Sequence, residues 1–212
     1  MPKKSVDLAG KTRGAERKPR LVPSAPKGLP VVYQLKIVLK DVKPAIWRRF
    51  QVAGDISFAR LSSIIQIVMG WQDAHLHEFS IGRLCIGVPD PDEPPLGPEL
   101  TDEETVRLNE VIKDEKVKFA YDYDFGDGWR HELTVEKVLP WEKGAGPPCC
   151  LAGKRCCPPE DCGGPWGYKD LLKAIGDPAH PEHGEIMDWL GGDFDPEEFD
   201  LESINQALGV LG

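Results

Sequence analysis

Alternation of apolar and polar positions marks several stretches of the chain as strands. Over residues 31–40 the side chains that share one face of the predicted strand are apolar: Tyr33, Leu35, Ile37 and Leu39. The opposite face is largely polar, and a two-residue period of this kind is typical of a half-buried strand. Shorter stretches with the same period predict further strands over residues 46–52 and 75–81.

A helical period follows the second of these strands. Between Ser57 and Gly70 the apolar side chains recur at helical spacing, at Phe58, Leu61, Ile64, Ile65, Val68 and Met69. Ser57 is suited to the N-cap, and Gly70 is suited to end the helix in a left-handed conformation. The pattern therefore predicts one amphipathic helix.

The aromatic segment near the middle of the chain predicts a hairpin. Its strands cover residues 117–125 and 129–135, and Gly126-Asp127-Gly128 turns the chain between them. A three-residue loop that contains glycine suits a hairpin with a left-handed position. This register predicts two cross-strand pairs, Tyr123 with His131 on the apolar face and Asp124 with Arg130 on the other.

The remaining segments complete an α+β pattern. Residues 87–105, rich in proline and acids, predict a surface excursion, and residues 148–165, with five of the six cysteines, predict a second loop. Three short helices are then predicted, over residues 168–176, over residues 186–190 and from Asp195-Pro196 onward. Strands first and helices last indicate a single α+β domain over residues 30–210. We expect a mostly antiparallel or mixed sheet, with helices packed on one face and a helical C-terminal segment.

Charge is divided unevenly along the chain. The first 28 residues carry eight Lys or Arg and two acids, a formal charge of +6, which leaves −15 for the rest of a chain whose total is −9. With almost no large apolar side chains, residues 1–28 cannot offset the entropy of ordering, so we predict a disordered basic tail. The acidic body excludes a general nucleic-acid surface, whereas the tail predicts a weak, salt-dependent nucleic-acid contact.

Two further patterns bear on the cellular compartment. The chain has no apolar run near the roughly 20 residues of a membrane span, and no signal peptide opens it. Six cysteines without an export signal indicate reduced thiols or metal ligands more than a disulfide framework. We therefore expect a cytoplasmic protein with no membrane partner.

The cysteine-rich segment is one candidate for a metal site. Zinc takes four tetrahedral ligands, and the four residues between Cys157 and Cys162 match a usual ligand spacing. We predict zinc bound by Cys150, Cys157, Cys162 and a histidine, either His131 or one of its alternatives His75, His77 and His183. The competing interpretation is a loop of reduced thiols, because a buried Cys otherwise behaves as a small hydrophobe.

Histidines and carboxylates provide a second candidate. His75, His77, Asp124, Glu160 and Asp161 are predicted to contribute to a binding surface, because imidazole and carboxylate groups bind ligands and metals. A metal-dependent enzyme that uses His75, His77 and His131 with Glu160 or Asp161 is the alternative. A histidine on an apolar strand face is more often a packed core residue, and no nucleophile with a partner accompanies these histidines.

Five motifs occur in a fixed order between residues 30 and 210. They are PAIWRR at 44–49, GWQDAHLHEF at 70–79, YDYDFGDGWRH at 121–131, CPPEDCGGPWGY at 157–168 and WLGGDFDPEEFD at 189–200. In this order they resemble the plasmid Orf-three-like family, named after a reading frame on an Ri plasmid, which includes insertion-element passenger proteins labelled TnpR. The resemblance implies a single α+β domain and no assigned biochemical activity.

The sequence leaves three functions open. A resolvase, which the TnpR label suggests, would need an early serine nucleophile in an arginine-rich setting and a helix-turn-helix tail, and the sequence has neither. The leading interpretation is a non-enzymatic binding or adaptor module of mobile-element type, stabilised by zinc. The alternatives are the metal-dependent enzyme and a DNA-transaction accessory protein that acts through the basic tail.

Overall fold

The computed structural model describes residues 31–90, 99–141, 146, 148–192 and 194–211. The predicted basic tail, residues 1–28, lies outside them. The strands are β1 (Val31–Leu39), β2 (Trp47–Ala53), β3 (His77–Ile81), β4 (Leu84–Gly87), β5 (Leu100–Asp102), β6 (Lys118–Tyr123), β7 (Trp129–Pro140) and β8 (Cys149–Lys154). The helices are α1 (Phe58–Met69), α2 (Leu108–Val111), α3 (Gly164–Gly176), α4 (His183–Trp189) and α5 (Leu201–Val210).

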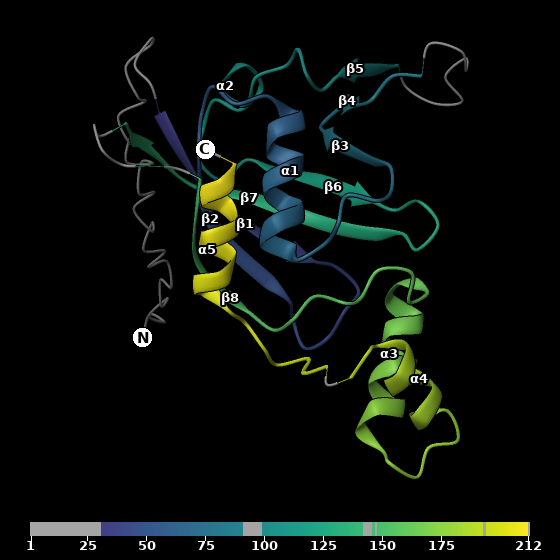
Figure 1. Ribbon diagram of the computed structural model, residues 1–212. Helices are drawn as coiled ribbons and strands as arrows, with labels where there is room; N and C mark the ends of the chain where they lie inside the picture. The colour runs from purple at the N-terminus through teal and green to yellow at the C-terminus, as the bar shows by residue number, and fades with distance from the viewer. Residues whose placement is uncertain (1–30, 91–98, 142–145, 147, 193, 212) are drawn as a thin grey trace, which may run out of the picture.

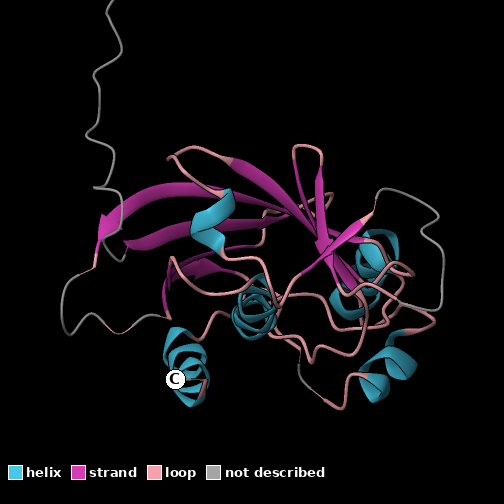
Figure 2. Ribbon diagram, turned by 90° about the horizontal axis from the view of Figure 1, so that it is seen from above, coloured by secondary structure: helices cyan, strands magenta, loops and turns pink. Residues whose placement is uncertain are grey.

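All of these strands belong to one sheet, in the order β5-β4-β3-β6-β7-β1-β2-β8 (Figure 1). Neighbours are antiparallel except β4 and β5, which run parallel, so the sheet is mixed. Helices α1 and α5 lie on the same side of it (Figure 2), whereas α3 and α4 pack together beyond one end of the strands (Figure 1). The predicted α+β class, with a mixed sheet and a helical C-terminal segment, is confirmed. None of the helices in the described ranges is long and apolar enough to cross a membrane.

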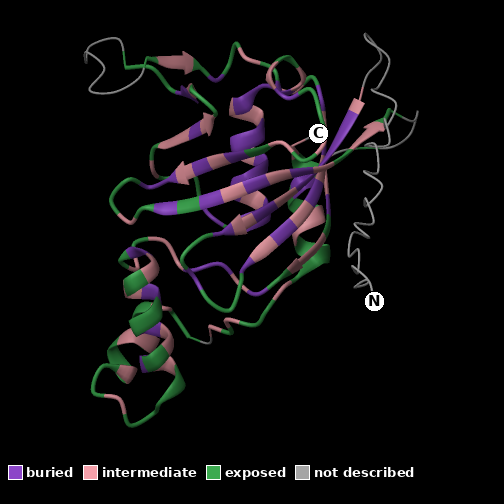
Figure 3. Ribbon diagram, turned by 180° about the vertical axis from the view of Figure 1, so that it is seen from behind, coloured by how far each residue is buried: buried purple, intermediate pink, exposed green. Residues whose placement is uncertain are grey.

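The core lies between the sheet and α1, as the apolar periodicity predicts. Tyr33, Leu35, Ile37 and Leu39 of β1 are all almost fully buried. Both predicted caps of α1 are present: the Ser57 side chain accepts a hydrogen bond from the Arg60 amide, and Gly70 ends the helix at φ 90°. Seen from behind, buried and less buried positions alternate along the strands (Figure 3).

The β6–β7 hairpin differs from the predicted register by two residues. Tyr123 pairs with Trp129, Tyr121 pairs with His131, and Asp122 lies opposite Arg130. The loop has five residues because Asp124 adopts φ 53° and its carbonyl accepts a hydrogen bond from the Gly128 amide at 2.6 Å. A shift of two residues preserves the faces of the strands. It moves Phe125 out of the strand, however, to the exposed tip of the turn.

Three other expectations are corrected near the sheet edges. Cys149–Lys154, predicted as loop, is strand β8, and Leu100–Asp102, within the predicted surface excursion, is strand β5. Edge strand β8 is held by α5, because the Asn205 side chain bonds both the amide (2.8 Å) and the carbonyl (3.0 Å) of Cys150. Helix α5 begins after Asp200, whose carboxylate accepts from the Ser203 amide, and not at Asp195-Pro196.

Candidate functional site

Three loops far apart in the sequence meet at one end of the sheet. They are the segment after α1 (residues 70–76), the β6–β7 turn (residues 124–128) and the segment between β8 and α3 (residues 155–163). We call them the first, second and third loops. The second loop lies beside the top of α3 in Figure 1. Four of the five residues predicted to form a binding surface lie on these loops.

Hydrogen bonds donated by backbone amides hold the second loop to the other two. The Asp124 amide donates to the Leu76 carbonyl at 2.9 Å, and the Gly163 amide donates to the Asp127 carboxylate at 3.2 Å. Gly164, at φ 68°, comes so close that a Cβ atom there would lie 2.2 Å from the Asp127 carbonyl oxygen. Only glycine fits this approach, so the contact between the two loops depends on it.

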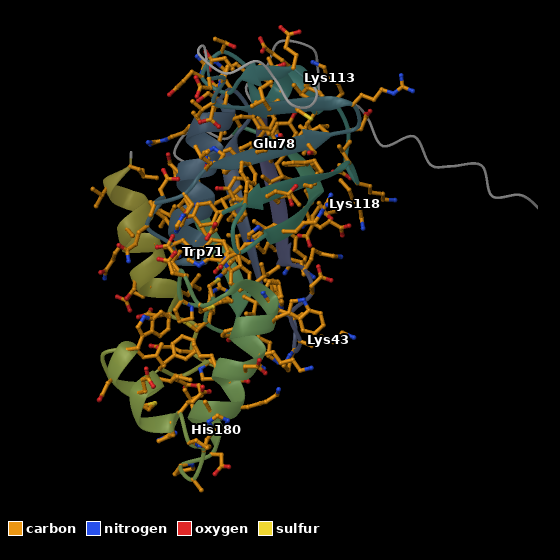
Figure 4. All side chains as sticks on the ribbon, turned by 90° about the vertical axis from the view of Figure 1, so that its right-hand side faces the viewer. Lys43, Trp71, Glu78, Lys113, Lys118 and His180 are labelled. Carbon is orange, nitrogen blue, oxygen red and sulfur yellow. The ribbon has the colours of Figure 1, made fainter. Side chains whose placement is uncertain are left out.

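Trp71 supplies a buried floor beneath the loops. Its ring stacks on Tyr123 with centroids 5.1 Å apart, meets His131 edge-on at 5.1 Å and lies 6.0 Å from Trp129. Its indole N–H donates to the Pro158 carbonyl at 2.9 Å and so ties the first loop to the third. Figure 4 shows Trp71 where the sheet approaches the α3–α4 pair.

His75, Asp124 and Asp161 come from the three loops and form one cluster. Nε2 of His75 lies 3.3 Å from Oδ1 of Asp161 and 3.7 Å from Oδ2 of Asp124. This nitrogen is shielded from solvent and finds no hydrogen-bond partner among the described residues. In the described ranges, this is the one group of three His, Cys, Asp or Glu ligand atoms that all lie within 4.8 Å of one another.

The conformation of the second loop orients the Asp124 carboxylate. Its Oδ1 accepts hydrogen bonds from the amides of Gly126 at 2.9 Å and Asp127 at 3.2 Å. Because Oδ1 is occupied in closing the turn, Oδ2 is left to face His75. Asx turns of this kind explain why an aspartate tolerates the left-handed conformation here.

Glu160 joins the cluster through Tyr123. The Tyr123 hydroxyl donates to Oε1 of Glu160 at 2.5 Å and accepts from the Ala74 amide at 3.0 Å. The same carboxylate oxygen accepts from the Gln72 amide at 3.3 Å. Burial, followed by the hydrogen bond and the charge of Glu160, raises the pKa of Tyr123. The phenol is therefore a fixed donor that links the first and third loops.

His77 does not belong to this cluster. It lies on β3, where its Nε2 pairs with Oε2 of Glu103 at 2.7 Å, and both side chains are largely buried. Its ring packs against Tyr121. The pair ties β3 to the segment after β5, so the structure places His77 in the packing of the fold and not with the other four binding-surface candidates.

The four residues predicted to bind zinc do not assemble into a site. No three of the ligand atoms of Cys150, Cys157, Cys162 and His131 come within 4.8 Å of one another. Cys150 lies on β8, and the Cys157 sulfur packs 3.9 Å from the sulfur of Met69. Burial raises the pKa of Cys157 and of Cys162 to about 12, so both are protonated thiols at neutral pH. Neutral buried thiols pack as small hydrophobes.

His131 is a fully buried residue of β7. Its Nδ1 bonds the Tyr121 carbonyl at 3.0 Å, and its Nε2 has no partner among the described residues. Burial lowers the pKa of His131 to about 4. A neutral, enclosed imidazole fits the interpretation of this histidine as a core residue.

Comparison with known proteins places this domain in a family. The model of the plasmid pRiA4b ORF-3-like protein family matches residues 31–203, which hold all three loops. The chain belongs to this family. The domain is 39% identical over 182 residues to the uncharacterized protein y4hQ of Sinorhizobium fredii, a match that covers 85% of this chain and 92% of that protein. It is also similar to the crystal structure of a protein of unknown function, MM3350 of Methanosarcina mazei Go1, with a TM-score of 0.74 and 39% identity. That match covers 82% of this chain and 97% of that one.

Other residues of this family domain surround the cluster, and the sequence alone does not assign them to a site. Trp71 and Tyr123 stand within motifs that carry the family resemblance, yet their position under the loops depends on tertiary packing. Leu76, Phe125 and Trp166 are large apolar side chains that the fold leaves exposed. For Phe125 the signal was present in the sequence: glycine and aspartate residues surround it, as expected at the tip of a turn.

Proposed function

We propose that this domain is a binding module, and that the three loops with the first turn of α3 form its recognition surface. The observation that carries the proposal is the pairing of exposed apolar side chains with the acidic cluster. Leu76 follows His75 directly, and Phe125 follows Asp124 directly. Trp166 lies in the first turn of α3, two residues beyond the Gly164 contact with the second loop.

The apolar side chains of this surface are exposed to an unusual degree. Leu76 is 67% exposed, Phe125 60% and Trp166 78%. Single exposed apolar residues are common on proteins, but a group beside a rigid polar cluster is typical of a protein interaction site. The backbones of the loops are braced by Trp71 and Gly164, so the loops need less ordering when a partner binds, which lowers the entropy cost of binding.

The charge of the surface favours a basic partner. Asp124, Glu160, Asp161 and Asp127 gather here, and in the described part of the chain no Lys or Arg forms an ion pair with any of them. The chain as a whole is acidic, with a net charge of −9. We therefore expect a protein segment in which Lys or Arg residues flank aromatic or aliphatic ones, because complementary charge supports specificity and the association rate.

A displayed library of random peptides, selected on the full-length protein in the presence of a metal chelator, tests this function. We expect the selected peptides to be enriched in Lys or Arg beside large apolar residues. Phe125→Ser and Trp166→Ser should each weaken the binding of a selected peptide by about tenfold or more, as for central interface residues. Val210→Ser is the matched control, because Val210 is 86% exposed at the end of α5, away from the loops.

Both replaced residues are exposed, so the variants should unfold at the same temperature as the parent protein. Peptides without a basic enrichment would contradict the charge argument. Equal affinity for the parent and for both loop variants would show that the partner binds elsewhere.

A further inference from the structure

We propose that His75, Asp124 and Asp161 bind a divalent transition-metal cation. The donor set consists of one imidazole nitrogen and two carboxylate oxygens, each from a different loop. Metal–ligand bonds of about 2.1 Å place neighbouring ligands about 3.0 Å apart in an octahedral site and about 3.4 Å apart in a tetrahedral one. The distances from His75 Nε2 to the two carboxylates, 3.3 Å and 3.7 Å, are close to this range.

The unpaired state of the donor atoms supports a cation between them. His75 Nε2 is solvent-shielded, aimed at two carboxylates and not hydrogen-bonded to either. The Asp124 side chain is nine-tenths buried, and within the residues described its Oδ2 makes no hydrogen bond and no ion pair other than the one with His75. The carboxylates of Asp124 and Asp161 both face His75 and repel each other. A divalent cation between them offsets that repulsion.

The surroundings hold the ligands in position before an ion binds. The amides of Gly126 and Asp127 fix the Asp124 carboxylate through Oδ1, which is the kind of outer support that orients ligands in metal sites. The His75 ring lies edge-on against Tyr123, with centroids 5.8 Å apart. Asp161, in contrast, is exposed on 73% of its side chain, so the open side of the site faces solvent.

The donor set selects the class of cation. The imidazole nitrogen favours zinc, iron, nickel or copper over calcium and magnesium, which prefer oxygen donors alone, and the two carboxylates also admit manganese. Three protein ligands leave at least one coordination position for water or for a group on a bound partner. This site shares Asp124 and Asp161 with the proposed peptide surface, but the ion needs only the three side chains, and metal binding is measured without any peptide.

The test is a Mn²⁺ titration of the full-length protein, followed by electron paramagnetic resonance of the free ion. Mn²⁺ is the probe because it prefers oxygen and nitrogen donors to thiols, so the cysteines do not compete for it. We expect one ion per chain. Loss of a group that only hydrogen-bonds to a metal ligand, without touching the ion, typically costs 10–100-fold in metal affinity. His75→Ala and Asp161→Asn should therefore each weaken binding by about tenfold or more.

Asp188→Asn is the matched control, because it removes one carboxylate from the exposed surface of α4, and it should change the affinity less than about twofold. Asp161 is exposed, so its replacement leaves the fold intact and keeps the test valid if His75→Ala is unstable. Equal Mn²⁺ affinity in Asp161→Asn, Asp188→Asn and the parent protein would overturn the proposal, as would the lack of saturable binding. The peptide selection is carried out in the presence of a chelator, so its outcome does not depend on whether the protein binds a metal.

Discussion

Trp71→Phe tests whether the floor beneath the loops stabilises the fold. Trp71 is 7% exposed and makes two kinds of contact: ring packing with Tyr123, Trp129 and His131, and the N–H bond to the Pro158 carbonyl. Phenylalanine keeps part of the packing but has no donor. The variant therefore leaves the buried Pro158 carbonyl without this partner.

The expected cost follows from these two losses. An unpaired buried carbonyl costs about 1–3 kcal/mol. The smaller ring removes buried apolar surface and leaves a space beside Tyr123, which adds about 1 kcal/mol or more. We therefore expect Trp71→Phe to lower the free energy of unfolding by roughly 2–4 kcal/mol.

Urea denaturation followed by far-ultraviolet circular dichroism measures this change, with the slope m as a check on two-state unfolding. Trp166→Phe is the matched control: the same substitution at a 78% exposed position should cost less than about 0.5 kcal/mol. If Trp71→Phe costs no more than this control, the indole does not connect the first and third loops as described.

Three further predictions concern the packing that holds the loops. Trp129→Ala removes a fully buried side chain and should cost roughly 3–5 kcal/mol in urea denaturation; full stability combined with loss of peptide binding would instead place Trp129 on the recognition surface. Gly164→Ala should lower the melting temperature and weaken binding of both the peptide and Mn²⁺, since its Cβ would push Asp127 away; unchanged melting and binding would refute the close approach. Stability should fall as the pH decreases from about 6.5 to about 4, because His131 has a folded-state pKa lowered to about 4 while the unfolded chain binds a proton near 6.5. The loss over that window is up to roughly 3 kcal/mol, and His131→Gln should show a shallower pH dependence in denaturant titrations; an unchanged slope would assign the effect to other groups.

Local patterns predicted the elements whose apolar periodicity is strong. The alternation in β1 and the capped stripe of α1 appear in the structure as expected, since side-chain burial and capping are both set by near neighbours in sequence. Strand β8 was missed because small and polar residues make up half of Cys149–Lys154, and its pairing with β2 and support from Asn205 come from distant parts of the chain.

The hairpin shows where local reasoning selected the wrong register. The sequence allows a turn over three residues or over five, and the choice depends on hydrogen bonds of the Asp124 side chain. Arg130 meets an acid in either register, Asp124 in the predicted one and Asp122 in the structure, so charge pairing did not discriminate between them.

The candidate site was predictable in its residue types but not in its grouping. His75, Asp124, Glu160 and Asp161 were singled out as binding candidates, whereas their convergence depends on loops that meet only after the sheet has formed. His77 was grouped with His75 because both carry an imidazole within the strand predicted over residues 75–81. The structure separates them because β3 begins at His77 and leaves His75 in the first loop.

A crystal structure of the full-length protein grown with Mn²⁺, with anomalous diffraction data that locate the ion, tests the central claim most directly. The claim is that loops distant in sequence bring His75, Asp124 and Asp161 into one site. We predict one strong anomalous peak within about 2.3 Å of His75 Nε2 and of an oxygen of each carboxylate. Loops that lie apart in the measured coordinates, or a peak bound by other residues, would contradict it.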